Sequence, residues 1–195
     1  MRAVFSLAVS VIFSGCSGLA RIPYKSAKTF EVNATGQARP IKGQLIAADL
    51  LAHSTHWPHR IGDRVAFLGR DGKMIYRVIV EKENFGFDLA LLTLDEPVEV
   101  GNHFIAPVGE ARVGEPVTIF RHWGREPLGT IMRKITPGEI FGWTKKKNII
   151  SGDSGGAWYQ LIEGKPHLVG LSHRAGLGGR SPNLHAILTK RARGE

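Results

Sequence analysis

The chain of 195 residues contains a single cysteine, Cys16. One cysteine cannot form an intramolecular disulfide, so the chain does not belong to the small secreted domains held together by such bridges. Hydrophobic runs are also short: the run Ala3–Phe13 has about eleven residues, whereas a membrane-spanning helix needs about 20. No internal repeat, low-complexity tract or long helical period is present. Hydrophobic residues make up 43% of the chain and charged residues 22%, which is typical of a globular protein.

The N-terminus has the features of an export signal, because Arg2 precedes the short apolar run 3–13. The following Phe13-Ser-Gly-Cys16 resembles a bacterial lipoprotein box, and this resemblance implies that the Cys16 thiol is acylated. We therefore expect an export signal over residues 1–15, a tether over 16–28, and a mature protein in the cell envelope, either anchored to a membrane through Cys16 or secreted. The alternative is an ordinary cleaved signal with an incidental cysteine.

The formal net charge is +9, a sign that favours polyanions such as nucleic acid or anionic lipid. The basic residues are scattered, however, apart from the runs Lys145–Lys147 and Lys190–Arg193, which we interpret as solvated surface charge. We expect no specific nucleic-acid partner. A basic module bound to an anionic membrane or nucleic acid is a further alternative, and it would show strong salt dependence.

Short apolar segments separated by turns indicate an all-β fold, consistent with 24 glycines and 10 prolines. A polar, glycine-containing boundary near residues 101–113 divides the chain into halves 29–105 and 106–195. The predicted strands lie at residues 29–33, 44–47, 64–68, 74–80, 89–94, 116–120, 129–135, 139–143, 155–160, 167–172 and 185–189, and a further pair surrounds a turn at residues 48–49. About a dozen short strands are typical of a barrel or sandwich.

Three stretches carry chemistry: a histidine segment that ends in His56-Trp57, an aspartate that precedes a strand in Asp88-Leu-Ala-Leu-Leu, and Gly152-Asp-Ser-Gly-Gly before another strand. A serine alone is a weak nucleophile, so it needs a base within hydrogen-bonding reach and an acid that orients the base. Together the motifs closely resemble the chymotrypsin-like serine peptidases, whose chain order is also His, Asp, Ser.

The resemblance implies two packed antiparallel six-stranded β-barrels, with the histidine and aspartate in the first and the serine in the second. It implies that Ser154 is the nucleophile, His56 the general base and Asp88 the acid that orients it. The backbone N–H groups of Gly152 and Ser154 would form the oxyanion hole. His53 is the competing candidate for the base; we favour His56, and expect His59 to lie on the surface.

Specificity is indicated by resemblance alone. Asn148 would lie near the base of the primary pocket, and Ser172 and His173 would line a wall that binds substrate; His173 with Arg174 could favour an acidic side chain or simply face solvent. In many members a new N-terminal amine pairs with the residue that corresponds to Asp153. No typical activated N-terminus is present here, so we expect Asp153 to have an internal donor.

The prediction is therefore an exported serine endopeptidase that acts on protein or peptide substrates without a cofactor or a metal. The alternative is a catalytically inactive binding protein with the same fold. One departure concerns the C-terminus, where most members have a helix. After the strand expected at 185–189 only six residues remain, too few for a stable helix, and we expect none.

Overall fold

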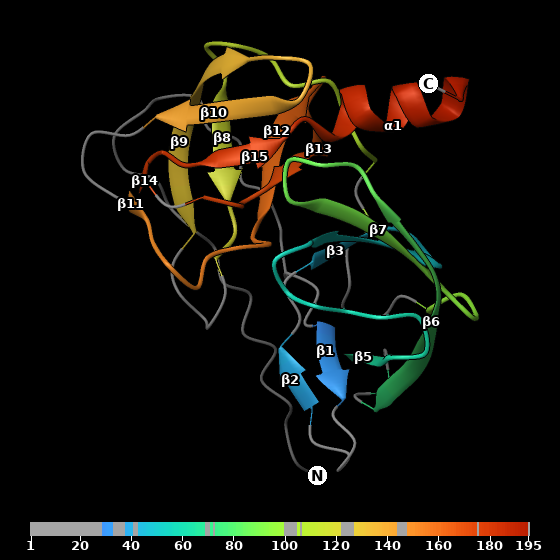
Figure 1. Ribbon diagram of the computed structural model, residues 1–195. Coiled ribbons are helices and arrows are strands. Elements are labelled where there is room, and N and C mark those ends of the chain that lie inside the picture. Colours follow the sequence, from blue (N-terminus) through green and yellow to red (C-terminus); the bar gives the residue numbers. More distant parts are fainter. Residues whose placement is uncertain are drawn as a thin grey trace, which may run out of the picture.

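The computed structural model describes residues 29–32, 38–40, 43–68, 71, 73–99, 105, 107–121, 127–143, 148–174 and 176–194. The predicted export signal, Cys16 and the tether lie outside these residues. The described chain is mostly β, with two curled antiparallel sheets and one C-terminal helix (Figure 1). Among the described residues, no helix combines the length and apolar character required to cross a membrane.

The N-terminal sheet has seven strands in the order β2-β1-β5-β6-β7-β4-β3. The strands are β1 (Thr29–Val32), β2 (Ala38–Pro40), β3 (Gly43–Ala47), β4 (Leu50–Ser54), β5 (Arg64–Leu68), β6 (Met74–Asn84) and β7 (Leu89–Leu94). The long strand β6 curls this sheet: its first part pairs with β5 and its second part pairs with β7, with a register shift between Ile79 and Glu81.

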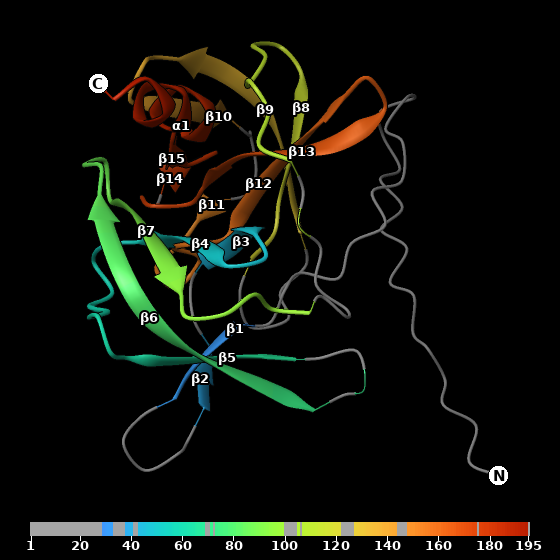
Figure 2. The same ribbon diagram turned by 90° about the vertical axis from the view of Figure 1, so that its right-hand side faces the viewer.

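The C-terminal sheet has six strands in the order β13-β12-β8-β9-β10-β15, and a separate pair is formed by β11 and β14. The strands are β8 (Pro116–Ile119), β9 (Leu128–Ile135), β10 (Glu139–Trp143), β11 (Asn148–Ile149), β12 (Ala157–Ile162), β13 (Lys165–Leu171), β14 (Gly176–Leu177) and β15 (Arg180–Pro182). In the side view of Figure 2 this sheet lies above the lower strands β1, β2 and β5 of the N-terminal sheet.

Among the described residues, three clusters of buried hydrophobic side chains form the core. One lies within the N-terminal sheet and contains Leu45, Phe67 and Leu92, and one lies within the C-terminal sheet around Trp158 and Met132. The third, which we call the shared cluster, draws on both halves: Ala52, Leu89, Leu91, Ala157, Tyr159, Leu168, Leu171, Leu184 and Ile187. The two sheets therefore bury part of their apolar surface against a common core.

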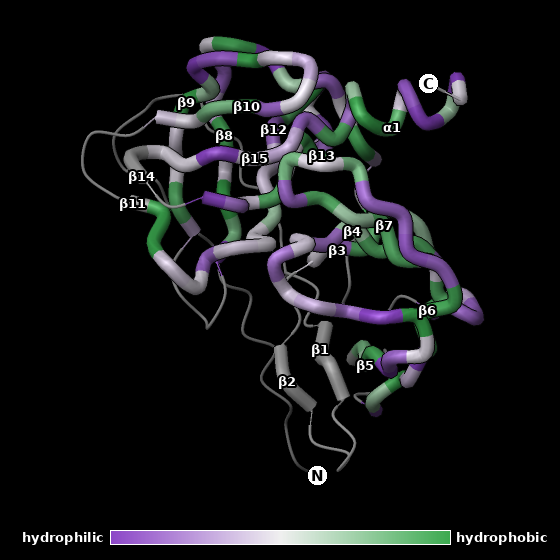
Figure 3. The backbone as a smooth tube through the Cα atoms, in the orientation of Figure 1, coloured by the Kyte–Doolittle hydropathy of each residue, from purple (hydrophilic) through white to green (hydrophobic). Residues whose placement is uncertain are grey.

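The chain ends in a helix, α1 (Leu184–Arg193), so the predictions of a strand at 185–189 and of no closing helix were wrong. Asn183 caps the helix, because its side chain accepts a hydrogen bond from the backbone N–H of Ala186 at 3.2 Å. Leu184 and Ile187 are buried in the shared cluster, and hydrophilic residues occupy other positions of the helix (Figure 3). A helix of this length is only marginally stable in isolation, and the packing of its apolar face against the shared cluster stabilises it.

The expected predominance of β-structure in two antiparallel sheets is confirmed. The N-terminal sheet has seven strands, however, where six were expected. Most predicted strands exist. Three have the expected bounds, β5, β7 and β10. The turn at 48–49 joins β3 to β4 as expected. The strand β6 continues to Asn84, beyond the expected end at residue 80, because its second part pairs with β7.

Candidate active site

The backbone pairing of β4 with β7 brings the histidine segment beside the aspartate. Ser54, the last residue of β4, pairs with Leu89, the first residue of β7. The residues that follow β4 therefore lie next to the residue that precedes β7. The N–H of Thr55 donates to the carbonyl of Asp88 at 3.2 Å and extends this pairing by one step. The antiparallel pairing of β4 with β7 therefore brings His56 and Asp88 together.

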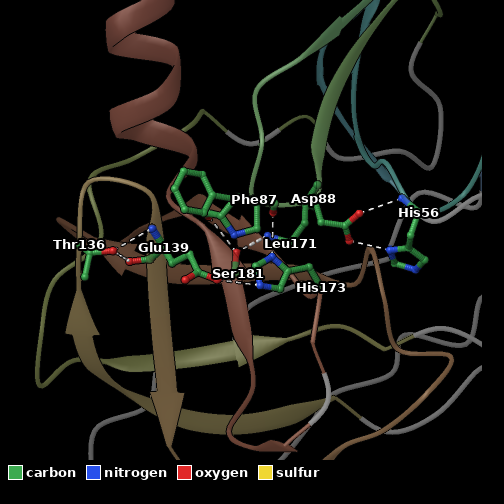
Figure 4. A network of polar contacts seen from close by, with 9 residues as sticks. His56, Phe87, Asp88, Thr136, Glu139, Leu171, His173 and Ser181 are labelled. Carbon is green, nitrogen blue, oxygen red and sulfur yellow. Dashed lines mark hydrogen bonds and ion pairs between the residues drawn. The ribbon is translucent and has the colours of Figure 1, made fainter.

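The carboxylate of Asp88 accepts three hydrogen bonds from described residues, and Figure 4 shows the two that come from His56. Nδ1 of His56 lies 2.6 Å from Oδ2. The other oxygen, Oδ1, accepts from the hydroxyl of Thr55 and from the backbone N–H of His56, both at 2.8 Å. Because a carboxylate is an acceptor, this geometry places a proton on Nδ1 and leaves Nε2 of a neutral ring as the acceptor.

The pKa of Asp88 reflects two opposing effects. Partial burial acts to raise it, whereas the hydrogen bonds from Thr55 and His56, together with the attraction of the His56 ring, lower it. The donors prevail, so the pKa of Asp88 lies below its ordinary value of 3.8. Asp88 is therefore an anion at neutral pH. The His56 side chain remains 42% exposed beside it, within reach of a molecule in solution.

The turn that carries Asp88 has an unusual backbone. Both Phe87 and Asp88 have positive φ angles, 48° and 61°, although neither is a glycine. This left-handed conformation costs about 1–2 kcal/mol per residue for an L-amino acid. Within its own sheet the turn is closed by two hydrogen bonds, from the N–H of Phe85 to the carbonyl of Leu89 and from the N–H of Leu89 to the carbonyl of Gly86.

Ser154 lies on a tight turn between β11 and β12. Gly152 and Gly155 flank the central residues and have φ angles of 98° and 76°, which glycine adopts readily. Asp153 between them is fully buried. Its backbone N–H donates to the carbonyl of Ile150, and its Oδ2 accepts from the backbone N–H of Ile150 at 3.1 Å. The expected internal donor to Asp153 therefore includes this backbone group.

The N–H groups expected to form the oxyanion hole are those of Gly152 and Ser154. Among the described residues, no hydrogen bond involves either N–H group. The neighbouring amides are occupied: the N–H of Gly155 donates to the carbonyl of Ser172 at 2.6 Å, and that of Gly156 donates to the carbonyl of Asp153. Within the described part of the chain, the N–H groups of Gly152 and Ser154 are donors of the kind that stabilises a negatively charged oxygen.

Gly156 is required by a close approach of two backbones. A Cβ atom at this position would lie 2.2 Å from the carbonyl oxygen of Phe120. Strand β12 begins at the next residue and pairs with β8, so the second glycine of the motif lets the turn dock against the end of β8.

A short series of contacts links the serine turn to Asp88. The N–H of Gly155 donates to the carbonyl of Ser172. The next residue, His173, contacts the carbonyl oxygen of Phe87 through Nδ1 at 2.8 Å, and Phe87 directly precedes Asp88. Two hydrogen bonds therefore connect the serine turn, through residues 172–173, to the turn that carries Asp88.

Three residues were expected to bind substrate, and two of them have buried side chains. Asn148 begins β11, where its backbone pairs with Leu177. Ser172 is fully buried, and its hydroxyl accepts a hydrogen bond from Nε1 of Trp158 at 2.7 Å. The side chain of His173 is 3% exposed. The side chains of Ser172 and His173 thus lie within the protein rather than on an accessible wall.

The competing histidine, His53, is fully buried in β4 and makes a contact of 3.1 Å between Nε2 and the carbonyl oxygen of Trp57. Its ring lies 4.4 Å from that of His59. His59 is 4% exposed, so the expectation that it lies on the surface was wrong. The packing of two imidazole rings against each other explains its burial. Asp88 contacts the ring of His56.

Two residues of the site, Thr55 and Glu139, were not predicted from the sequence. The hydroxyl of Thr55 donates to Asp88 across 33 positions of sequence; a hydroxyl residue directly before the candidate base was the only local signal. Glu139 lies 2.9 Å from His173 and had no local signal. Within the described residues, no group of three or more His, Cys, Asp or Glu side chains is arranged to hold a metal ion.

A comparison with protein-family models found no matching family, and a search of curated proteins found no matching relative.

Proposed function

We propose that the protein is a serine endopeptidase in which Ser154, His56 and Asp88 form a catalytic triad. The observation that carries this proposal is the contact of 2.6 Å between Nδ1 of His56 and Oδ2 of Asp88. A carboxylate in this position fixes the tautomer of a histidine that acts as a general base. The sequence motif around Ser154 and its open backbone amides support the assignment of the nucleophile.

In the proposed reaction, Nε2 of His56 accepts the proton of the Ser154 hydroxyl while Oγ attacks the carbonyl carbon of a peptide bond. The negative charge that develops on the carbonyl oxygen is stabilised by the N–H groups of Gly152 and Ser154. The protonated His56 then gives its proton to the leaving amine, and an acyl-enzyme remains. Water, deprotonated by His56, releases the acyl group and regenerates Ser154.

The environment of Asp88 suits this role. Its lowered pKa keeps the carboxylate charged at neutral pH, so it stabilises the imidazolium that forms in each step. The hydroxyl of Thr55 and the N–H of His56 hold the second oxygen. The carboxylate is thereby fixed against rotation while Oδ2 faces the ring.

The finer aspects of the fold and location belong to the same proposal. We propose that the two curled sheets are the two barrels of a chymotrypsin-like fold, and that the protein is exported and anchored through an acylated Cys16. Metabolic labelling with a radioactive fatty acid tests the anchor. The wild-type protein should incorporate label and Cys16→Ser should not; labelling of both variants would contradict acylation at this residue.

Labelling with a fluorophosphonate probe tests the catalytic proposal without knowledge of the substrate. Oγ of an activated serine attacks phosphorus, fluoride leaves, and the serine proton passes to the base. Wild-type protein should be labelled at Ser154, whereas Ser154→Ala and His56→Ala should not. Ser151→Ala is a matched control, because Ser151 is an exposed hydroxyl residue on the same turn, and it should be labelled at the wild-type rate.

Cleavage of a quenched fluorescent protein substrate then separates a peptidase from an esterase. A folded wild-type protein that is never labelled would exclude an activated serine, and an inactive binding protein with this fold would become the better account. Labelling that persists in His56→Ala and disappears in His53→Ala would identify His53 as the base.

A further inference from the structure

His173 lies at the junction of the two halves, two residues after the end of β13. Its Nδ1 lies 2.8 Å from the carbonyl oxygen of Phe87 in the N-terminal half. Its Nε2 lies 2.9 Å from Oε1 of Glu139 in the C-terminal half. A carbonyl oxygen only accepts, so Nδ1 carries a proton and donates it. Figure 4 shows the resulting series of contacts from Glu139 through His173 and Phe87 to Asp88 and His56.

The two contacts of the ring differ in kind. The contact with Phe87 is a hydrogen bond. The contact of Nε2 with Glu139 lies within ion-pair distance, but its geometry is not that of a hydrogen bond. The His173 side chain is 3% exposed. A buried ring between two acceptors has little freedom to turn.

Glu139 is itself held firmly. Its backbone N–H donates to the hydroxyl of Thr136 at 3.0 Å, and its carbonyl accepts from both the N–H and the hydroxyl of Thr136. These bonds close the turn between β9 and β10. The carboxylate therefore extends from a fixed point of the C-terminal sheet toward His173.

At its other end His173 contacts a turn that needs support. Phe87 and Asp88 both have left-handed backbones, and such conformations persist only where the surroundings fix them. The ring of Phe87 also packs on Gly138: a Cβ atom there would lie 2.1 Å from its Cζ atom. The C-terminal half thus holds the Asp88 turn at two points, the ring and the carbonyl of Phe87.

We propose that His173 is a positioning residue for Asp88. By holding the carbonyl of Phe87 it fixes the strained turn, and so keeps the Asp88 carboxylate directed at His56. This inference rests on the proposed function for its catalytic consequence, because it deepens the account of the same site. It assigns His173 to the orientation of the triad and not to contact with substrate, in agreement with the burial of its side chain.

Three variants separate the hydrogen bond from the bulk of the ring. In His173→Asn the amide nitrogen occupies nearly the position of Nδ1 and can still donate to Phe87. His173→Gln places its amide nearer the position of Nε2, and His173→Leu keeps a similar volume without a donor. We expect the fluorophosphonate labelling rate to fall ~10- to 100-fold in the Leu and Gln variants, as for a displaced catalytic group, and to stay near the wild-type rate in the Asn variant.

A second measurement does not require catalysis. A proton held between Nδ1 of His56 and a carboxylate gives a low-field proton resonance, which is assigned by its loss in His56→Gln. This resonance should be present in the wild-type protein and in His173→Asn, and it should be lost or shifted in His173→Leu. A merely structural role would instead lower the unfolding temperature of all three His173 variants in parallel, without rescue of the resonance by asparagine.

The outcomes are distinct. If the wild-type protein is not labelled but the low-field resonance depends on His173 as described, the peptidase proposal fails and the positioning role stands. If folded His173→Leu keeps both the labelling rate and the resonance, the positioning role is refuted while the peptidase proposal stands. Equal losses in the Asn and Leu variants also refute it, because the hydrogen bond to Phe87 would then not be the decisive contact.

Discussion

Replacement of Thr55 by valine removes one of the three hydrogen bonds that the Asp88 carboxylate accepts and keeps the shape of the side chain nearly unchanged. The lost bond is the contact of 2.8 Å between Oγ1 and Oδ1. The N–H of His56 still donates to the same oxygen, so the carboxylate keeps its place in part. The hydroxyl is also among the donors that lower the pKa of Asp88, and this pKa should therefore rise in Thr55→Val.

The size of the effect follows from the energy of a hydrogen bond to a charged group, about 1.5–3 kcal/mol. The Asp88 side chain is 21% exposed, so water can partly replace the lost donor and the lower limit applies. A factor of ten in rate corresponds to about 1.4 kcal/mol. We therefore expect the second-order rate constant of fluorophosphonate labelling to fall about tenfold.

The assay compares Thr55→Val with Thr55→Ser, which keeps the hydroxyl and loses the methyl group. The serine variant should be labelled near the wild-type rate. A valine variant that is folded and reacts as fast as the wild-type protein would refute the reasoning, because the hydroxyl would then have no part in holding Asp88. Equal losses in both variants would attribute the effect to packing of the methyl group.

Further predictions concern the site and the fold. Asp88→Asn should lower the labelling rate about 10⁴-fold, the effect known for the same change in a chymotrypsin-like triad; a rate near wild type would exclude Asp88 from the triad. As the pH falls, Asp88 is protonated near pH 3.8 in the unfolded chain but only at lower pH in the folded protein. The contribution of Asp88 to the free energy of unfolding is therefore complete above pH 3.8, and it is lost as the pH falls through the lower pKa of the folded state. Urea unfolding at several acidic pH values should show a weaker pH dependence in Asp88→Asn than in the wild-type protein. Gly156→Ala should abolish labelling and destabilise the fold, because its Cβ would lie 2.2 Å from the Phe120 carbonyl oxygen; an alanine variant with wild-type labelling would show that the two backbones can separate. Asn183→Ala should reduce the free energy of unfolding by about 1–2 kcal/mol, since it removes the cap of α1, and an unchanged urea midpoint would contradict this role.

The strands were predictable where the pattern is local. The bounds of β5, β7 and β10 agree with the sequence prediction, because each is a short apolar segment with turn residues on both sides. The extension of β6 to Asn84 was not predictable in this way, since pairing with β7 and not its own hydropathy keeps this polar segment extended.

The C-terminal helix shows the opposite failure. The segment 184–193 contains Leu184, Ile187 and Leu188, a spacing that suits one face of a helix, and Asn183 provides a cap. The small number of residues after the strand expected at 185–189 instead favours a chain end without a helix. The stability of α1 comes from its packing on the shared cluster, which neither helix propensity nor segment length predicts.

In the candidate site, the pairing of His56 with Asp88 was predictable because both residues lie in the sequence motifs and the neighbouring strands β4 and β7 pair in one sheet. The contact of His173 with Phe87 spans 86 positions of sequence. It depends on how the two halves pack, which no local pattern specifies. The contact with Glu139 depends in the same way on the turn between β9 and β10.

The shared cluster has a consequence for how the proposed active site is assembled. Its residues come from β4 and β7 of one half and from β12, β13 and α1 of the other. If one half unfolds, the apolar side chains that the other half contributes to this cluster are exposed to water. We therefore expect a single cooperative unfolding transition rather than two. The proposed base and acid belong to the first half and the proposed nucleophile to the second. A chain in which the two halves have not yet packed together would keep the proposed base and acid apart from the proposed nucleophile, so we expect the proposed activity to require both folded halves.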